Sequence, residues 1–299
     1  MTLDQRIRSR ETYFGDNWSV VRQLYESQSS IVYEVARKNH PELRSSAMKA
    51  VEIKPVAADG TPLSEKECRM SLSNALGEVH IMYNNRENDH ILKYLDHCEF
   101  PVTDDAGTVI GYDLLIRTEL LPTLDRWLRN NGRITERLVI RLGQDILQAM
   151  KLCHSQNVIH NAIDPESIFV AGMGFKLGNF SRAVFADGSR VSAAGHESLL
   201  NTSPETYRGE SPSRLSDLYS LGLVLHSLMN DNLPPFITRN SSLREYKTAI
   251  LRRIKGETLT APVNAGKALA QVILRACAFE PANRYESAEA MLDALNSIR

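Results

Sequence analysis

The chain has 299 residues, of which 42% are hydrophobic and 24% are charged, and its formal net charge at pH 7 is -1. A chain of this length can bury one large core or two smaller ones without disulfide or metal staples. The nearly balanced charge gives no overall attraction to nucleic acid or to an acidic membrane surface. We therefore expect a folded cytoplasmic protein that binds no nucleic acid.

The cysteines and the N-terminal residues indicate the same class of protein. The cysteines are widely spaced and form no CxxC pair, which favours free thiols over a zinc site; they are Cys68, Cys98, Cys153 and Cys277. The first residues, "MTLDQRIRSRETYFG", lack the apolar core of a signal peptide, and no run approaches the ~18–20 apolar residues that cross a bilayer. We expect no membrane segment in this chain, and we treat residues 1–17 as an N-terminal extension.

Residues 18–121 carry a strand-rich pattern. Apolar and polar side chains alternate in "WSVVRQLY", "SIVYEVAR" and "SAMKAVEIK", as they do in antiparallel strands. Further strands are predicted in "ILKYLDHCEF" and "GYDLLIRTELL". Between the two groups, apolar residues recur at helical spacing at Leu72, Leu76, Val79 and Met82. The pattern predicts a small antiparallel β-sheet with one main helix.

Residues 122–299 are mostly helical in pattern. The segment "ERLVIRLGQDILQAMKLCHSQN" places apolar residues on one stripe of a long helix; they are Leu138, Leu142, Ile146, Ala149 and Cys153. Further helices are predicted in "SDLYSLGLVLHSLM", "AGKALAQVILRACAF" and "ESAEAMLDALNSI". The first of these is apolar almost all round, which is typical of a helix buried inside a lobe. The chain is therefore expected to adopt an α+β fold of two lobes, the larger one mainly helical.

Several short segments occur in a fixed order along the chain. They are "AMK" at 47–49, "GEVHIM" around Glu78, "VIHNAIDPESIFV" at 158–170, then "KLGNFSRA", "SPETYRGE", "SDLYSLGLVL" and "FEPANRY". In this order they resemble the landmarks of the eukaryotic-type (Hanks-type) Ser/Thr protein kinase family, over roughly residues 18–297. The resemblance implies a bilobal protein kinase-like fold, and it is greater to bacterial Ser/Thr kinase domains than to tyrosine kinases.

The resemblance implies a nucleotide site in which some of the family's residues are replaced. Lys49 matches the lysine that pairs with phosphates, and the implied site as a whole consists of Lys49, Glu78, Val32, Ala47, Glu119, Leu121 and Phe169. The family's phosphate-binding loop needs glycines, because a Cβ atom keeps backbone N–H groups away from the phosphates. The matching residues here are Tyr25, Ser27 and Ser30. We expect ATP to bind weakly if it binds at all.

The positions that match the family's chemistry are also changed. The catalytic aspartate is matched by Ala162, and the loss of a general base costs ~10²–10⁴ in rate. The metal positions carry Ser167 and Asn179, which lack the charge that Mg²⁺ prefers, so we expect no metal. Asp164 replaces a lysine and reverses its charge. Asp164 is an alternative base on the same face of an extended segment, but its charge would repel phosphates.

The positions that match the family's structural residues are kept. The resemblance implies that they form a hydrophobic column, its anchor on a buried helix and an ion pair of Glu205 with Arg284; they are His160, Phe180, Tyr94, Met82, Asp217, Glu205 and Arg284. We therefore predict a pseudokinase that is not an enzyme and that acts as a scaffold or allosteric module. The expected partner is a protein, either an active kinase or its substrate. The expected contact surfaces are the helical lobe and the loop 179–205.

The alternative is a divergent ATP-dependent Ser/Thr protein kinase, or another ATP-using transferase, with weak nucleotide binding through Lys49 and Glu78. Thermal unfolding with ATP, in the presence and absence of Mg²⁺, separates the two hypotheses, because a ligand at 100 times its Kd stabilises a protein by ~2.7 kcal/mol.

Overall fold

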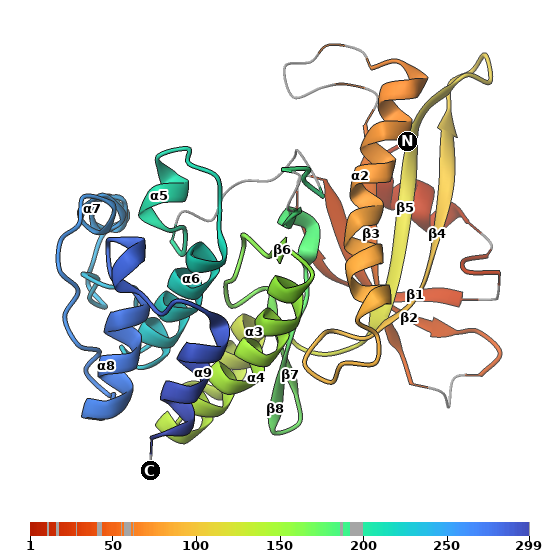
Figure 1. Ribbon diagram of the computed structural model, residues 1–299. Coiled ribbons are helices and arrows are strands. Elements are labelled where there is room, and N and C mark those ends of the chain that lie inside the picture. Colours follow the sequence, from red (N-terminus) through yellow and green to blue (C-terminus); the bar gives the residue numbers. More distant parts are fainter. Residues whose placement is uncertain are drawn as a thin grey trace. The chain divides into compact units, whose positions relative to one another are not determined.

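Figure 1 shows the ribbon of the computed structural model. The structure describes residues 1–10, 12–15, 18–27, 29–40, 44–54, 56, 61, 63–185, 188–191 and 200–298, so the predicted contact loop 179–205 lies partly outside the described residues. The chain forms two compact units, and along the chain the first gives way to the second between Leu121 and Pro122.

The first unit is built on a five-stranded antiparallel sheet in the order β1-β2-β3-β5-β4. The strands are β1 (Trp18–Glu26), β2 (Ser30–Arg37), β3 (Ser46–Ile53), β4 (Tyr94–Thr103) and β5 (Val109–Glu119). One long helix, α2 (Glu65–Asn84), packs mainly against β5. It begins in a capping box in which Ser64 and Glu67 exchange hydrogen bonds. This arrangement confirms the predicted small sheet with one main helix.

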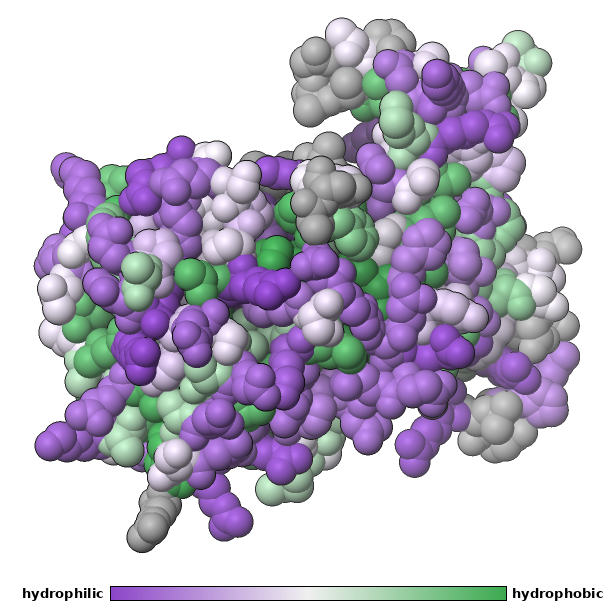
Figure 2. All heavy atoms as spheres, in the orientation of Figure 1, coloured by the Kyte–Doolittle hydropathy of each residue, from purple (hydrophilic) through white to green (hydrophobic). Residues whose placement is uncertain are grey.

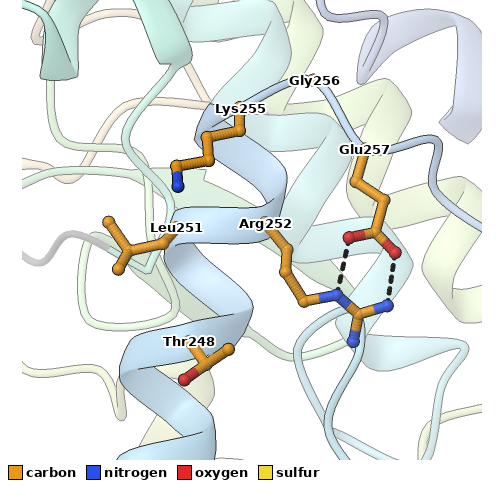
Figure 3. A pocket seen from close by; sticks show the side chains of 6 residues that line it. All are labelled: Thr248, Leu251, Arg252, Lys255, Gly256 and Glu257. Atoms are coloured by element: carbon orange, nitrogen blue, oxygen red, sulfur yellow. Dashed lines mark hydrogen bonds and ion pairs between the residues drawn. The ribbon is translucent and has the colours of Figure 1, made fainter.

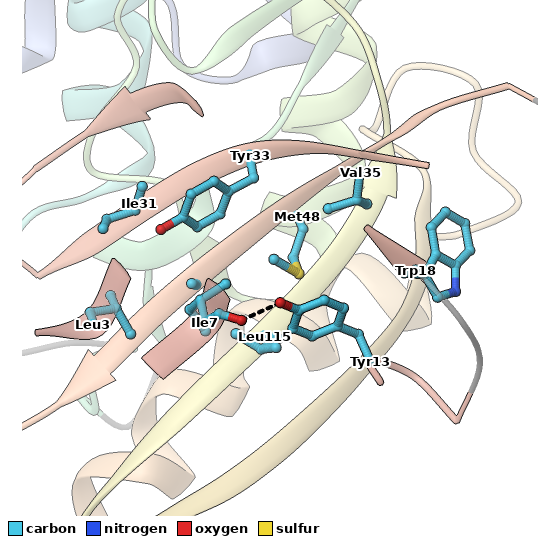
Figure 4. Packing of buried hydrophobic residues seen from close by; sticks show 10 residues of the cluster. Leu3, Ile7, Tyr13, Trp18, Ile31, Tyr33, Val35, Met48 and Leu115 are labelled. Atoms are coloured by element: carbon cyan, nitrogen blue, oxygen red, sulfur yellow. Dashed lines mark hydrogen bonds between the residues drawn. The ribbon is translucent and has the colours of Figure 1, made fainter. Parts of the chain in front are cut away.

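The opposite face of the sheet is covered by the N-terminal residues. Helix α1 (Leu3–Ser9) begins in a capping box of Thr2 and Gln5. Side chains of this segment enter a buried cluster with alternate residues of β2 and β3, which point to one face. This cluster, here called the α1 cluster and drawn in Figure 4, consists of Leu3, Ile7, Tyr13, Trp18, Ile31, Tyr33, Val35, Met48, Ala50 and Leu115. Residues treated as an extension therefore form part of the core of the first unit.

Two arginines attach this N-terminal segment to the sheet. Arg6 donates from Nε and Nη2 to the carboxylate of Asp113 in β5, at 3.0 and 2.7 Å, and from Nη2 to Glu52 in β3 at 2.8 Å. Arg10 adds a hydrogen bond to Asp113 at 3.1 Å. Asp113 is fully buried, and a buried carboxylate is tolerated only when it is paired and hydrogen-bonded.

The second unit is mainly helical, as predicted. Its helices are α3 (Leu124–Asn131), α4 (Glu136–Ser155), α5 (Pro204–Tyr207), α6 (Arg214–Leu228), α7 (Leu243–Ile254), α8 (Lys267–Ala276) and α9 (Ala288–Asn296). Two short antiparallel ribbons pair β6 (Val158–Ile159) with β9 (Val184–Phe185) and β7 (Ile168–Ala171) with β8 (Gly174–Leu177). Short 3₁₀ turns lie at Phe180–Arg182 and Pro281–Asn283.

Helix α6 is buried along nearly its whole length, as its apolar pattern predicts. A glycine lets α8 approach it closely. A Cβ atom on Gly222 would lie 2.9 Å from the Cβ atom of Ala276 and 2.8 Å from the Sγ atom of Cys277. Because real Cβ contacts are longer, any larger residue at 222 would push the two helices apart.

The thiols agree with the sequence expectation. All four cysteines are free thiols. On the face shown in Figure 2, hydrophobic residues form scattered areas between hydrophilic ones. Within the described parts of the chain, no helix combines the length and the apolar composition needed to cross a bilayer.

His226 of α6 is a buried histidine that we expect to make stability depend on pH. Its Nε2 atom lies 3.0 Å from the carbonyl oxygen of Thr260, and its Nδ1 atom has no hydrogen-bond partner among the described residues. Burial lowers the pKa of His226, although the hydrogen bond to Thr260 opposes this. The unfolded chain therefore binds the proton more readily than the folded chain, so stability is full above about pH 6.5 and falls as the pH decreases.

We expect the urea concentration at the midpoint of unfolding to decrease as the pH is lowered from about 7.5 to about 5.5. His226→Gln should weaken this dependence, because the amide still donates to Thr260 but does not titrate. His80→Gln, at an exposed position in α2, is the matched control. An unchanged pH dependence in His226→Gln would contradict the assignment.

Candidate active site

Lys49 and Glu78 form an ion pair inside the first unit. Lys49 lies in the middle of β3 and points away from the α1 cluster, since its neighbours Met48 and Ala50 point into that cluster. Its Nζ atom lies 2.9 and 2.7 Å from the two carboxylate oxygens of Glu78 in α2. The side chains are only 18% and 5% exposed, so water screens this pair less than a surface pair.

The other residues of the implied nucleotide site lie near the ends and edges of these strands. Val32 of β2 lies directly opposite Lys49 in the strand register, and Ala47 is two residues before Lys49 on the same face of β3. Glu119 ends β5, where its Oε1 atom accepts a hydrogen bond from the backbone N–H of Lys93 at 2.8 Å. Leu121 is the last residue before the chain enters the second unit.

The turn between β1 and β2 uses its own hydrogen-bonding groups. The N–H of Ser27 donates to the carbonyl oxygen of Ser30 at 2.8 Å, and the N–H of Ser30 donates to Ser27 Oγ at 3.1 Å. The two hydroxyl oxygens are 2.9 Å apart. N–H groups bonded in this way are not available to phosphate oxygens, so this turn differs from a glycine-rich phosphate loop in bonding as well as in sequence.

In the second unit, Asp217 of α6 holds the segment after β6. Its Oδ2 atom accepts from the backbone N–H of His160 and its Oδ1 atom from that of Asn161, both at 2.8 Å. The His160 ring lies against Phe180 with centroids 4.9 Å apart. Sequence reasoning missed His154, whose Nε2 atom lies 2.9 Å from Asp217 Oδ2. The available signal was a polar residue next to Cys153 on the apolar stripe of a helix, because a buried polar group needs a partner.

Asp164 forms a tight turn two residues after Ala162. Its Oδ1 atom accepts hydrogen bonds from the backbone N–H groups of Glu166 and Ser167, at 2.9 and 2.8 Å. Burial raises the pKa of Asp164 above its usual value, while these N–H donors and the nearby His160 oppose the shift. The segment is thus a hydrogen-bonded turn rather than the extended segment expected for Asp164, and it carries a carboxylate that holds a proton more readily than usual.

The residues at the implied metal positions do not fit Mg²⁺. Ser167 is fully buried, and its hydroxyl donates to the carbonyl oxygen of Asp164 and accepts from the N–H of Asp164, both at 2.9 Å. Asn179 is neutral, and its Oδ1 atom accepts a hydrogen bond from Ser181 at 3.3 Å. No group of three or more His, Cys, Asp or Glu side chains that could hold a metal occurs in the described ranges. Mg²⁺ prefers anionic oxygens in octahedral geometry, which these side chains do not supply.

The residues of the implied hydrophobic column are divided between the units. Met82 in α2 is buried, and Tyr94 in β4 packs edge-on against Tyr83 with ring centroids 5.9 Å apart. In the second unit the column residues are His160 and Phe180, which pack against each other. Phe169, which belongs to the implied nucleotide site, lies in β7 and forms an isolated bridge with Thr123. A column continuous through both units stays a prediction.

Glu205 and Arg284 form a buried ion pair in the second unit. Arg284 donates from Nη1 and Nη2 to the two carboxylate oxygens of Glu205, at 2.7 and 2.8 Å. Burial alone would raise the pKa of Glu205, but the hydrogen bonds and charge of Arg284 outweigh it and lower the pKa to about 2. The arginine also donates to the carbonyl oxygens of Leu215, Ala278 and Phe279. It therefore ties the start of α5 to α6 and to the segment after α8.

Comparison with known proteins covers both units. A family model described as "Protein kinase domain" matches residues 18–295. Serine/threonine-protein kinase PrkC of Bacillus subtilis (strain 168) is 27% identical over 175 residues, which cover 56% of this chain and 26% of that protein. Probable serine/threonine-protein kinase PknB of Lactococcus lactis is 24% identical over 241 residues, covering 74% and 37%. Serine/threonine-protein kinase PknB of Mycobacterium tuberculosis (strain H37Rv) is 30% identical over 178 residues, covering 56% and 27%.

These findings confirm the resemblance to Hanks-type kinases and overturn one prediction. The prediction that the protein is not an enzyme is wrong, because the relatives it matches are named serine/threonine-protein kinases. That prediction treated the altered positions as decisive, although the loss of some catalytic groups leaves the contributions of the remaining groups in place. The chain spans about a quarter to two fifths of the length of these relatives.

Proposed function

The chain belongs to the protein kinase domain family, and from this premise we propose that it is a divergent ATP-dependent Ser/Thr protein kinase with weak nucleotide binding. The observation that carries the proposal is the partly buried ion pair between Lys49 and Glu78. A lysine held by a carboxylate in a defined orientation is already placed to meet phosphate oxygens, so little reorganisation is needed when a nucleotide binds. The names of the relatives support the same reaction class.

In the proposed reaction a serine or threonine hydroxyl of a protein attacks the terminal phosphorus of ATP. A bond forms between the hydroxyl oxygen and phosphorus, the bond from phosphorus to the bridging oxygen breaks, and ADP leaves with that electron pair. Lys49 binds and orients the phosphates, and Asp164 accepts the hydroxyl proton. Burial raises the pKa of Asp164, which brings this carboxylate closer to the pKa of an effective base at neutral pH.

The altered positions make this a slow enzyme in the proposal. In the turn between β1 and β2, the N–H groups of Ser27 and Ser30 donate hydrogen bonds within the turn, so the turn binds phosphates weakly. Ser167 and Asn179 do not fit Mg²⁺, and no step is assigned to a metal. Because electrostatic stabilisation is usually the largest contribution to this chemistry, turnover should lie well below that of a kinase that keeps these groups.

We expect transfer of radiolabelled phosphate from ATP to a mixed Ser/Thr peptide library, and loss of that transfer in Lys49→Ala. Asp164→Asn should lower the rate by ~10²-fold or more, as the loss of a base does, while its amide oxygen keeps the turn to Glu166 and Ser167. Glu166→Gln, in the same turn and exposed, is the matched control and should leave the rate unchanged. Each assay is run with Mg²⁺, with Mn²⁺ and with a chelator.

Two results would contradict the proposal. Transfer that persists at the same rate in Lys49→Ala would assign the activity to a contaminant. ATP at 100 times its Kd should stabilise the protein by ~2.7 kcal/mol. Absence of transfer, together with no thermal shift at high ATP concentration, would show that the protein does not bind ATP. A rate unchanged in Asp164→Asn would reject only its role as proton acceptor.

A further inference from the structure

Helix α7 has an exposed basic face with an apolar residue at its centre. Residues three or four apart on a helix lie above one another, which places Arg244, Thr248, Leu251 and Lys255 in one row. Lys247 and Arg252 flank this row. These six residues, here called the α7 face, are all exposed, whereas Ala249, Arg253 and Ile254 on the other side of the helix are buried.

A shallow pocket of ≈ 380 Å³ opens at the C-terminal end of the α7 face; it is lined by Thr248, Leu251, Arg252, Lys255, Gly256 and Glu257. Figure 3 shows that Leu251 and Lys255 extend to one side, whereas Arg252 pairs with Glu257 on the other. The guanidinium of Arg252 also lies 4.1 Å from the ring centroid of Phe236. Arg252 is thus held in place by its own contacts, whereas Leu251 and Lys255 are the side chains of the pocket that can contact a ligand.

The remaining cations of the α7 face are not paired with an acid in the described part of the chain. Arg244, Lys247 and Lys255 make no ion pair with any part of the chain that the structure describes. Glu245, an acid within the helix, is used in its cap, where it accepts from the N–H and Oγ of Ser242 at 2.6 and 2.8 Å. In a chain of net charge -1, this local excess of positive charge attracts a partner with negative charge.

We propose that the α7 face docks an acidic segment of a protein substrate, whose carboxylates meet Lys255, Lys247 and Arg244 and whose apolar side chain covers Leu251. This inference rests on the proposed kinase function and names the class of its substrate. Leu251 is 44% exposed, and an apolar side chain between cations suits a peptide that mixes Asp or Glu with an apolar residue. Nucleic acid is disfavoured, because no aromatic ring lines the pocket to stack on a base and the whole chain is slightly acidic.

The buried side of α7 connects this surface to the α5 segment. Arg253 is 4% exposed and donates from Nη1 to the carbonyl oxygen of Thr202 at 2.6 Å and to Tyr219 Oη at 3.1 Å. Thr202 directly precedes Ser203, the residue that caps α5. A segment docked on α7 would therefore rest on a helix that is fixed within its unit, which limits the entropy cost of binding.

Fluorescence anisotropy with a labelled twelve-residue Glu/Leu peptide tests the proposal, using the full chain and no ATP. We expect the peptide to bind, a Lys/Leu peptide of equal length not to bind, and affinity to fall between about 0.05 and 0.5 M NaCl as the charges are screened. Lys247→Glu with Lys255→Glu should weaken binding by about tenfold or more, since two attractions become repulsions. Lys66→Glu with Lys267→Glu, both exposed helix positions, changes the net charge equally and should leave binding intact. Leu251→Ser should also weaken it.

An equal loss of peptide affinity in the control pair would show that the effect comes from overall charge and would overturn the proposal. Tighter binding of single-stranded RNA or of anionic lipid vesicles than of the acidic peptide would also overturn it. The outcome is separable from the proposed function, because binding is measured without ATP. Peptide binding without any phosphotransfer contradicts the kinase and keeps the docking face, whereas phosphotransfer without peptide binding does the reverse.

Discussion

Arg284→Ala is expected to lower the stability of the second unit by about 3–5 kcal/mol, the usual cost of removing one partner of a buried ion pair. The side chain of Arg284 is fully buried, and that of Glu205 is 6% exposed. Truncation leaves the carboxylate of Glu205 in the interior without its counter-charge. It also removes the donor from three backbone carbonyl groups. Urea unfolding followed by circular dichroism and by hydrogen exchange of α6 measures the change.

Arg208→Ala is the matched control, because Arg208 forms its ion pair with Glu210 at the surface. Exposed pairs of this kind contribute about 0–1 kcal/mol. A loss below about 1 kcal/mol in Arg284→Ala, no larger than in the control, would show that the pair does not stabilise the fold.

The same ion pair predicts a dependence on acid. The pKa of Glu205 is lowered to about 2 from 4.5, so the folded chain releases this proton more readily than the unfolded chain. The stabilisation is fully present above about pH 4.5 and is lost as the pH falls towards 2. This part of the acid dependence should be absent in Arg284→Ala.

Deletion of residues 1–17 is expected to prevent stable folding of the first unit, although the family match begins only at residue 18. The deletion removes Leu3, Ile7 and Tyr13 from the core, where each is at most 7% exposed. Burial of each such side chain contributes ~1.5–3 kcal/mol, and the total stability of a domain is only ~5–15 kcal/mol. The deletion also removes both arginines that pair with Asp113, which leaves a buried charge without a partner.

Soluble yield and hydrogen exchange of β2, β3 and β5 measure the effect of the deletion. If the deletion abolishes expression, Arg6→Ala tests the same contacts in a full-length chain. Its loss of unfolding free energy should be several times that of Arg8→Ala. Arg8 pairs with Asp4 in an exposed i,i+4 arrangement, which contributes about 0.3–0.5 kcal/mol. A deleted chain with native exchange protection would show that the N-terminal segment is dispensable.

The N-terminal segment also affects the candidate site through β3. Met48 and Ala50 pack in the α1 cluster, while Lys49 between them points to Glu78. Loss of α1 would therefore release the strand that carries the lysine, because adjacent residues of a strand support opposite faces of the sheet.

The sequence by itself determined the strands, the main helices, the buried character of α6 and the kinase family. These features depend on local periodicity and on the order of short segments, and both can be read along the chain. It also located Lys49, Glu78, Glu205 and Arg284, since each lies within one of those segments.

Only the tertiary structure decided what residues 1–17 do, because Arg6 and Asp113 are far apart in the chain and no local pattern connects them. It also decided that Ser167 and Asp164 satisfy each other in a turn, and that α7 exposes its cations around Leu251. Side-chain pairing of this kind depends on which elements pack together, and that is set by burial over the whole unit rather than by any short stretch of residues.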